Sequence, residues 1–210
     1  MLEYISGAVR VSLVTFVLCG FVYPFAVTGM AQLLMPYQAN GSVEKSAGGQ
    51  TIGSHLIGQE WSDPQWFHGR PSATVAPDVK DPTKTVAAPY NAASTSASNL
   101  GPTSKALQDR LTADRKSLEE AQPELTDKLL PADMLTTSGS GLDPDITPAN
   151  ASLQVARIAL ARSVAPERIA ALVEQHVTSR SLWIFGEPRV NVLELNLALE
   201  KFFPTNKGTR

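Results

Sequence analysis

The sequence has almost no cysteine and very little histidine. Its one cysteine, Cys19, lies inside an apolar run, so the rest of the chain has no disulfide and no thiol chemistry. The three histidines, His55, His68 and His176, are too scattered to match the spacing of a metal site. We therefore expect no metal centre and no disulfide scaffold.

The sequence motifs of common enzymes are also missing. There is no Gly-x-Ser-x-Gly elbow, no His-Glu-x-x-His, no Cys-x-x-Cys, no Walker loop and no dinucleotide fingerprint. Asp127, Asp133, Asp143 and Asp145 are available carboxylates, but no pattern pairs them. We therefore expect no catalytic residues, and an independent membrane-anchored hydrolase has no supporting constellation.

Charge of neither sign dominates. The chain has 18 Lys and Arg against 20 Asp and Glu, a net charge of −2, and no basic stretch. A protein that binds nucleic acid usually carries a positive patch to neutralise phosphates. Nucleic acid is therefore not an expected partner.

One long apolar run is present, at residues 11–35, and its only strongly polar side chain is Gln32. A bilayer core is crossed by about 20 mostly apolar helical residues, so this run predicts a single membrane-spanning helix. A cleaved signal peptide is an alternative, but its apolar core is shorter and the run lacks a good small-x-small cleavage site. A buried helix of a soluble protein is the other alternative.

The charges beside the run predict its orientation. Arg10 precedes it directly, whereas the first Lys or Arg after it is Lys45. The positive-inside rule then places the N-terminus in the cytoplasm and the rest outside. The expected organisation is a cytoplasmic tail (1–10), a transmembrane helix (11–35), a stem or linker (36–51), an extracytoplasmic domain (52–204) and a tail (205–210). Pro24 removes a backbone donor from the helix, so it is a candidate contact with a neighbouring membrane helix.

The domain reads as an alternation of helices and short strands. We predict a strand within residues 52–59, a long loop at 72–98, a helix at 103–121 capped by Thr103, and a strand at 134–137. Further along are a helix at 148–163, capped by Thr147, that packs through Leu153, Ala156 and Leu160, and a strand at 182–185. A helix from Pro166 carries Ile169, Leu172, Val173 and His176 on one face, and a last helix begins with Asn191 as its cap. This order predicts an α+β domain.

Two groups of residues are candidate binding features. Trp66, Phe67, His68 and Arg70 form an aromatic cluster, and Tyr90, Asn91 and Asn99 lie in or beside the long loop. Aromatic clusters usually close a core and otherwise form partner surfaces, so these seven residues are candidate partner contacts. The turn Ser138-Gly139-Ser140-Gly141 is a weaker candidate for binding a nucleotide phosphate, because it lacks the lysine and spacing of a phosphate loop.

Several stretches together resemble the C subunit of the Kdp-type potassium-transporting ATPase, the KdpC family. They are GSHLIGQ at 53–59, WFHGRPSA at 66–73, YNAA at 90–93, SNLGPT at 98–103, SGSGLDP at 138–144, QVAR at 154–157, AR at 161–162 and GEPRVNVL at 186–193. With the apolar run they cover nearly the whole chain in order. Residues 94–97 and 177–179 depart from the pattern of the family, which puts only one loop and one turn in question.

The resemblance implies a role in a bacterial inner-membrane complex that uses ATP to take up potassium. The expected partners are a channel-like potassium-binding subunit, a P-type ATPase subunit and a small fourth subunit, besides membrane lipid. ATP and potassium would be handled by the complex, and this chain lacks the phosphorylation sequence of a P-type pump. We expect a non-catalytic subunit that assembles with these partners. The alternative is a chaperone that raises the ATP affinity of the ATPase subunit, with nucleotide bound at the turn of residues 138–141.

Overall fold

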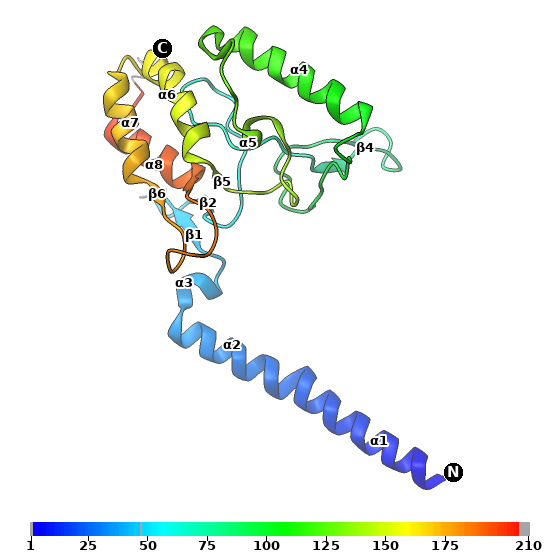
Figure 1. Cartoon of the computed structure of the whole chain (residues 1–210). Helices are drawn as coiled ribbons and strands as arrows, with labels where there is room; N and C mark the ends of the chain where they lie inside the picture. Colours follow the sequence, from blue (N-terminus) through cyan, green and yellow to red (C-terminus); the bar gives the residue numbers. More distant parts are fainter. Residues whose placement is uncertain (1, 47, 206–210) are drawn as a thin grey trace. The chain divides into compact units, whose positions relative to one another are not determined.

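The computed structural model describes residues 2–46 and 48–205, and the chain divides into two compact units, Met1–Ile52 and Gly53–Arg210 (Figure 1). The first unit is dominated by a helix and the second mixes helices with short strands. The predicted α+β class with one N-terminal apolar helix is confirmed.

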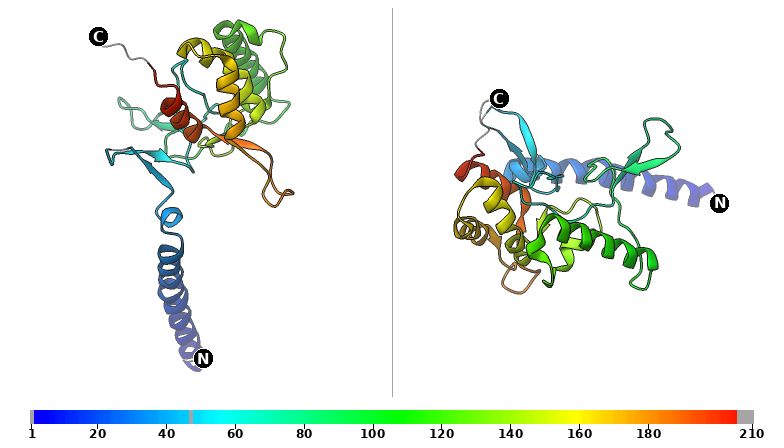
Figure 2. Two further views of the ribbon diagram at one scale, coloured as in Figure 1. Left: turned by 90° about the vertical axis from the view of Figure 1, so that its left-hand side faces the viewer. Right: turned by 90° about the horizontal axis from the view of Figure 1, so that it is seen from above.

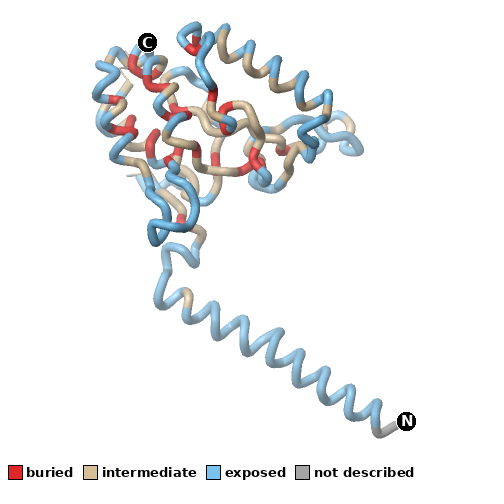
Figure 3. The backbone as a smooth tube through the Cα atoms, in the orientation of Figure 1, coloured by how far each residue is buried: buried red, intermediate tan, exposed pale blue. Residues whose placement is uncertain are grey.

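The first unit begins with a continuous helix made of α1 (Leu2–Val17), a π-helical turn (Leu18–Val22) and α2 (Tyr23–Leu34). Residues Tyr4–Leu34 are long and apolar enough to cross a membrane, and none of that window is buried within the chain. Figure 3 shows the backbone of this helix as exposed along almost its whole length. The helix thus begins at Leu2, before the predicted residue 11, and Arg10 and its neighbours lie within it.

The π-helical turn lies immediately before Pro24. A proline within a helix has no N–H and crowds the carbonyl four residues back, here that of Gly20. The wider turn changes the bonding register, so that the Tyr23 amide donates to Leu18 O, five residues back. The break predicted from Pro24 therefore takes the form of one π turn within an otherwise continuous helix.

The stem is more structured than its Gly- and Ser-rich sequence predicts. It contains α3 (Pro36–Ala39) and a two-stranded sheet of β1 (Val43–Lys45) and β2 (Thr51–Ser54). The Ser46 amide donates to Gln50 O at 2.8 Å beside the turn of this hairpin. The predicted stem thus contains backbone pairing that its side chains do not signal.

The second unit contains the remaining elements (Figure 2). In chain order they are β3 (Val75–Pro77), β4 (Thr85–Ala87), α4 (Lys105–Ala121), a 3-10 turn (Pro123–Leu125), α5 (Ala132–Leu135), β5 (Asp145–Ile146), α6 (Pro148–Arg162), α7 (Pro166–Gln175), β6 (Val177–Thr178), β7 (Arg189–Asn191) and α8 (Val192–Phe202). Strands β3 and β4 form one antiparallel pair, and β5-β7-β6 form a three-stranded antiparallel sheet.

The core is built by α6, α7 and α8 together with the three-stranded sheet. It comprises Phe67, Ile146, Ala151, Val155, Ile158, Ala159, Ile169, Leu172, Val173, Val190, Val192, Leu195 and Leu199. Figure 3 shows this region as the main concentration of buried backbone in the unit. A smaller cluster of Leu125, Leu130 and Met134 lies under the loop after α4, with Leu118 and Leu153 against it.

Local sequence signals set the ends of the core helices. Thr147 accepts a hydrogen bond from the Asn150 amide at 3.1 Å, and Pro148 occupies the first turn, as predicted for α6. Asn191 caps α8 in the same way, by accepting from the Glu194 amide at 3.1 Å. The predicted cap of α4 is wrong by one residue, because Ser104 rather than Thr103 precedes its first turn.

The predicted buried face of α6 is wrong for two of its three residues. Leu160 is 84% exposed and Ala156 is also exposed, whereas Leu153 packs against the smaller cluster. The buried face is instead formed by Ala151, Val155, Ile158 and Ala159. Both stripes have helical spacing, so the position of the neighbouring helices decides which is buried.

Three other predictions of local structure are also wrong. Residues 134–137 do not form a strand, because α5 occupies 132–135, with Asp133 in its first turn. Residues 182–185 form a loop between β6 and β7 and not a strand, with Leu182 at φ 50° and Trp183 at φ 63°. The expected unstructured loop at 72–98 contains the β3–β4 hairpin.

Candidate functional site

Residues 66–70 carry most of the predicted contact residues, and we call them the clamped segment. The segment has no helix or strand of its own, yet side chains from distant parts of the chain hold it. A backbone outside regular structure has to find other partners for its N–H and C=O groups when it is buried.

Phe67 is held by Asn196 of α8. The Phe67 amide donates to Asn196 Oδ1 at 2.9 Å, and Asn196 Nδ2 donates to Phe67 O at 2.9 Å. Both side chains are 0% exposed. One side-chain amide therefore satisfies both backbone groups of a buried residue, as a neighbouring strand would.

His68 is held in the same way by Gln154 of α6. The His68 amide donates to Gln154 Oε1 at 2.8 Å, and Gln154 Nε2 donates to His68 O at 3.0 Å. Arg157 Nη2 donates to the same Gln154 oxygen at 2.7 Å. The carboxamides of Gln154 and Asn196 thus pair with two consecutive residues of the clamped segment.

Trp66 and its neighbours are held by Arg162 at the end of α6. The Arg162 side chain is 0% exposed, and its guanidinium carbon lies 4.5 Å from the centre of the Trp66 ring. The guanidinium donates to Gln65 O at 3.0 Å, to Glu200 Oε2 at 2.9 Å and to Phe203 O at 2.6 Å. A buried arginine of this kind is tolerated because its charge is paired with Glu200 and because its Nε and Nη1 groups donate hydrogen bonds.

Gly69 and Arg70 are held by Tyr90 and Asp143. Tyr90 Oη donates to Arg70 O at 2.6 Å, and Arg70 Nη1 pairs with Asp143 Oδ2 at 2.9 Å. A Cβ placed on Gly69 would lie only 2.3 Å from Tyr90 Oη, so the close approach requires glycine. Burial, with a further contribution from Asp143, raises the pKa of Tyr90 to about 12. Tyr90 therefore remains a hydrogen-bond donor at ordinary pH.

The turn at residues 138–141 packs against this region and uses its own amides internally. The Gly141 amide donates to Ser138 Oγ at 2.8 Å, and the Leu142 amide donates to Ser140 Oγ at 3.1 Å. Ser72 Oγ donates to Gly141 O at 2.7 Å. Gly139, by contrast, is exposed and has open space around its Cα. Two of the amides that a phosphate would need are thus engaged within the turn.

The remaining predicted contact residues lie apart from one another. Asn91 Nδ2 donates to Val75 O at 2.8 Å and its amide donates to Thr74 Oγ1 at 3.1 Å, so it holds the start of β3. Asn99 is exposed, at φ 52°. Pro24 is exposed on α2, in the other unit.

The predicted contact surface at residues 66–70 is therefore mainly an internal hub. Phe67 is fully buried, which removes its side chain from any surface and corrects the prediction for that residue. Trp66, His68 and Arg70 are partly buried and bonded within the domain. Asn91 and Tyr90 are partly buried and bonded as well.

Sequence reasoning missed the residues that hold the segment, above all Gln154, Arg162 and Asn196. A signal for Asn196 was present, since it lies on the last helix among the apolar positions Val192, Leu195 and Leu199. A carboxamide on an apolar helical face needs a buried partner. The identity of that partner could not be found from spacing, because Phe67 lies 129 residues away.

Two of the depressions on the described surface of the domain are lined by charged side chains, and the first adjoins the clamped segment through Arg70. One, of about 340 Å³, is lined by Asp133, Asp143, Asp145 and Glu187 together with Arg70 and Arg189. Its arginines are paired with aspartates at 2.9 and 3.0 Å, and burial raises the pKa of Asp145. Across the residues that the structure describes, no group of three or more His, Cys, Asp or Glu side chains is placed to hold a metal ion.

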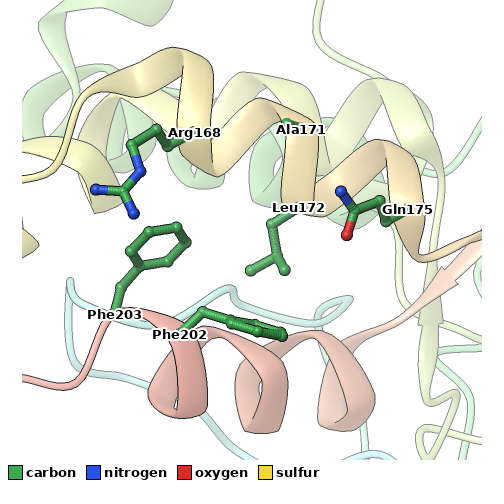
Figure 4. A pocket seen from close by; sticks show the side chains of 6 residues that line it. All are labelled: Arg168, Ala171, Leu172, Gln175, Phe202 and Phe203. Atoms are coloured by element: carbon green, nitrogen blue, oxygen red, sulfur yellow. The ribbon is translucent and has the colours of Figure 1, made fainter.

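The other depression is a groove of about 230 Å³ between α7 and α8. Figure 4 shows the Arg168 guanidinium beside the ring of Phe203, and Leu172 of α7 pointing toward Phe202 of α8. The Arg168 guanidinium carbon lies 4.7 Å from the centre of the Phe203 ring. The lining of the groove is about equally polar and apolar, with Arg168 and Gln175 as its polar side chains, and it contains no Asp, Glu or His for acid–base chemistry.

Protonation of His68 should destabilise the domain. Burial and the neighbouring Arg157 lower the pKa of His68 below its ordinary value of 6.5, and the bond to Asp63 O only partly opposes this. The unfolded chain then binds more protons than the folded chain between the lowered pKa and 6.5, so the free energy of unfolding falls as pH decreases through that interval. Chemical unfolding of the full chain in detergent, from about pH 8 to pH 5, measures this fall.

The control for this prediction is His68→Gln, which keeps a donor near Asp63 O but does not titrate. We expect a smaller loss of stability at low pH in the variant than in the wild-type chain. Equal pH dependence of the two proteins would show that His68 does not contribute to it.

The fold and the hub define the class of protein. It is a membrane-associated chain with one N-terminal apolar helix and an α+β domain whose polar side chains are used to hold its own backbone. A family profile described as the K⁺-transporting ATPase c chain, KdpC, matches residues 5–201. The chain therefore belongs to the KdpC family.

Individual relatives agree with the family match. A potassium-transporting ATPase KdpC subunit of Rhodopseudomonas palustris is 52% identical over 204 residues, which covers 97% of this chain and 100% of the relative. The subunit of the same name from Bradyrhizobium diazoefficiens is 54% identical over 202 residues, 96% of this chain and 98% of the relative. That of Methylobacterium nodulans is 50% identical over 202 residues.

Proposed function

We propose that this chain is a non-catalytic subunit of an ATP-driven potassium uptake complex. Its partners would be a channel-like potassium-binding subunit, a P-type ATPase subunit and a small fourth subunit. Membership of the KdpC family carries the proposal, because its relatives are named as subunits of a potassium-transporting ATPase. The side chains of Gln154, Arg162 and Asn196 hold the backbone of residues 66–70. This structural use of buried polar groups supports a scaffolding role over a catalytic one.

We infer that the helix of residues 4–34 spans a bacterial inner membrane with the N-terminus in the cytoplasm. Arg10 stands near its start, and Lys45 is the first cationic residue beyond its end, which fits the positive-inside rule. Large apolar side chains such as Phe16, Tyr23 and Leu33 are 62%, 68% and 81% exposed within the chain, so lipid or neighbouring helices would cover them.

The π turn before Pro24 supports this residue as a contact with the channel-like subunit. A widened turn leaves helix carbonyls without the usual partner, and neighbouring helices commonly satisfy such groups in membranes. In the domain, the exposed Asn99 remains a candidate contact, whereas the side chain of Phe67 does not.

The alternative is a chaperone that raises the ATP affinity of the ATPase subunit. Direct nucleotide binding at residues 138–141 has weak support, because the Gly141 and Leu142 amides are bonded to side chains of the turn. An effect on ATP affinity would then be indirect, through the conformation of the pump that the subunit favours.

Purification of the full chain from its native membranes in a mild detergent tests the proposal. We expect the potassium-binding and ATPase subunits to be recovered with it, and Pro24→Ala to reduce their recovery more than Leu160→Ala on the exposed face of α6. Recovery of the chain alone, with ATP hydrolysis by the chain itself, would overturn the proposed function.

A further inference from the structure

The loop between β6 and β7 exposes four consecutive large apolar side chains, and we call residues 181–186 the apolar loop. The exposed fractions of Leu182, Trp183, Ile184 and Phe185 are 78%, 90%, 74% and 64%. Elsewhere in the part of the domain that the structure describes, strongly exposed large apolar residues stand singly. Single exposed residues are ordinary, but a continuous exposed patch indicates an interaction site.

The apolar loop is ordered by its own hydrogen bonds. The Ser181 amide donates to Phe185 O at 2.8 Å, and the Phe185 amide donates to Ser181 O at 2.9 Å. Leu182 and Trp183 both have left-handed backbone angles, at φ 50° and 63°, which is a costly conformation for large side chains. The chain therefore forms a tight tip, which projects from the domain in the views of Figures 1 and 2.

No polar side chain interrupts this tip. Its four apolar residues are consecutive along a turn, and each is at least 64% exposed. A protein partner with a flat surface would cover only part of such a tip, whereas lipid surrounds an inserted group on every side. The shape and sequence of the tip therefore favour a lipid interface over a protein surface.

The base of the apolar loop is charged, and its charges are paired. Arg180 is paired with Glu187, and Arg189 is paired with Asp145. Tryptophan is enriched at the membrane–water boundary, and arginine is favourable beside anionic headgroups. An apolar tip with two arginines at its base thus has the order of layers that a membrane interface presents.

The chain also keeps the domain close to a bilayer. Only residues 35–52 separate the apolar helix from the second unit. Even fully extended they would span about 60 Å, and the β1–β2 hairpin shortens this reach. Tethering turns a weak membrane contact into an intramolecular event at high effective concentration.

We propose that the apolar loop inserts into the lipid interface and forms a second membrane attachment of the domain. The ligand is the headgroup and upper acyl region of the bilayer, entered by Trp183 and its apolar neighbours. The inference rests on the membrane-spanning helix of the proposed function but not on the partner subunits. Such an attachment would restrict how the domain rotates about its tether.

The test uses the full chain alone in nanodiscs of phosphatidylcholine and phosphatidylglycerol. Trp61→Phe and Trp66→Phe leave Trp183 as the single tryptophan. We expect its fluorescence to be blue-shifted, quenched by lipids brominated near the top of the acyl chain, and at least about twofold less quenched by acrylamide than a solvated indole, because interfacial groups lie about 5–10 Å into the boundary.

The matched control carries Trp183→Phe and Val79→Trp in the same background. Val79 is 98% exposed in the turn between β3 and β4, so its replacement reports a solvated loop of the same domain. Acrylamide quenching of Trp183 equal to that of this control would overturn the proposal. Shielding of Trp183 that appears only when the other subunits are added would also overturn it and would assign the loop to a protein contact.

The nanodisc holds no other subunit, so this result is separate from the test of the proposed function. A chain that fails to recover its partners can still insert the loop, and a chain that recovers them can leave it in water. Near-ultraviolet circular dichroism of each variant verifies that the tryptophan replacements leave the core folded.

Discussion

Replacing Asn196 with alanine should lower the free energy of unfolding by about 2–6 kcal/mol, because it leaves two buried backbone groups without partners at about 1–3 kcal/mol each. These groups are the N–H and C=O of Phe67, each 2.9 Å from the Asn196 carboxamide. Water cannot replace the carboxamide easily, since both residues are fully buried. Chemical unfolding of the full chain in detergent, followed by tryptophan fluorescence, measures the loss.

Two further variants make this prediction specific. Gln108→Ala removes a carboxamide from the exposed face of α4 and should change stability by no more than about 0.5 kcal/mol. Asn196→Asp keeps an acceptor for the Phe67 amide but turns a second oxygen toward Phe67 O. Its ionisation is disfavoured by burial, so the folded-state pKa of the new carboxyl lies above the unfolded value and stability is lost as pH rises.

The Asn196→Asp variant should therefore recover stability on acidification, when a protonated carboxyl donates to Phe67 O. This direction is opposite to the one expected from His68. A loss of less than about 1 kcal/mol in Asn196→Ala would mean that the carboxamide is not the partner that holds the segment.

Replacing Gly141 with alanine should also be strongly destabilising, by about 2–5 kcal/mol, because overpacking costs about 1–3 kcal/mol and a left-handed backbone costs about 1–2 kcal/mol. A Cβ at this position would lie 2.7 Å from Ser96 O and 2.7 Å from Thr74 Cγ2, and its φ is 71°. One contact is a backbone oxygen, which cannot move aside as a flexible side chain does. Thermal unfolding of the two proteins under identical conditions measures the effect.

Gly139 in the same turn supplies the control. A Cβ there would meet nothing within 4 Å, so Gly139→Ala should change stability by no more than about 0.5 kcal/mol. Comparison of Gly141→Ala with Gly139→Ala distinguishes the effect of close packing from the effect of reducing backbone flexibility in a glycine-rich turn. Equal effects of the two substitutions would show that the turn is not packed as described.

The sequence alone was sufficient where the signal is local. The caps at Thr147 and Asn191 were found because each lies within three residues of the amide it accepts. The buried stripe of α7, with Ile169, Leu172 and Val173, followed from helical periodicity. Local hydrogen bonds and helical spacing need no knowledge of the rest of the fold.

The role of the aromatic cluster could not be predicted from the sequence. Trp66 and Phe67 are equally compatible with a core and with a partner surface, because both environments remove aromatic rings from water. The choice was made by Asn196 and Gln154, which lie 129 and 86 residues away from their partners. The glycines that admit Tyr90 are also explained only by the packed chain.

The apolar loop is a second segment whose burial the sequence could not decide. Residues 182–185 are as apolar as a core strand, and only the β6–β7 register leaves them outside the sheet, at the tip of the connection. By itself the sequence determined one apolar helix, an α+β domain and most helix ends, because these depend on composition and on neighbours along the chain. The tertiary structure alone decided which apolar groups are buried and which remain exposed, because burial depends on contacts between residues that are distant in sequence.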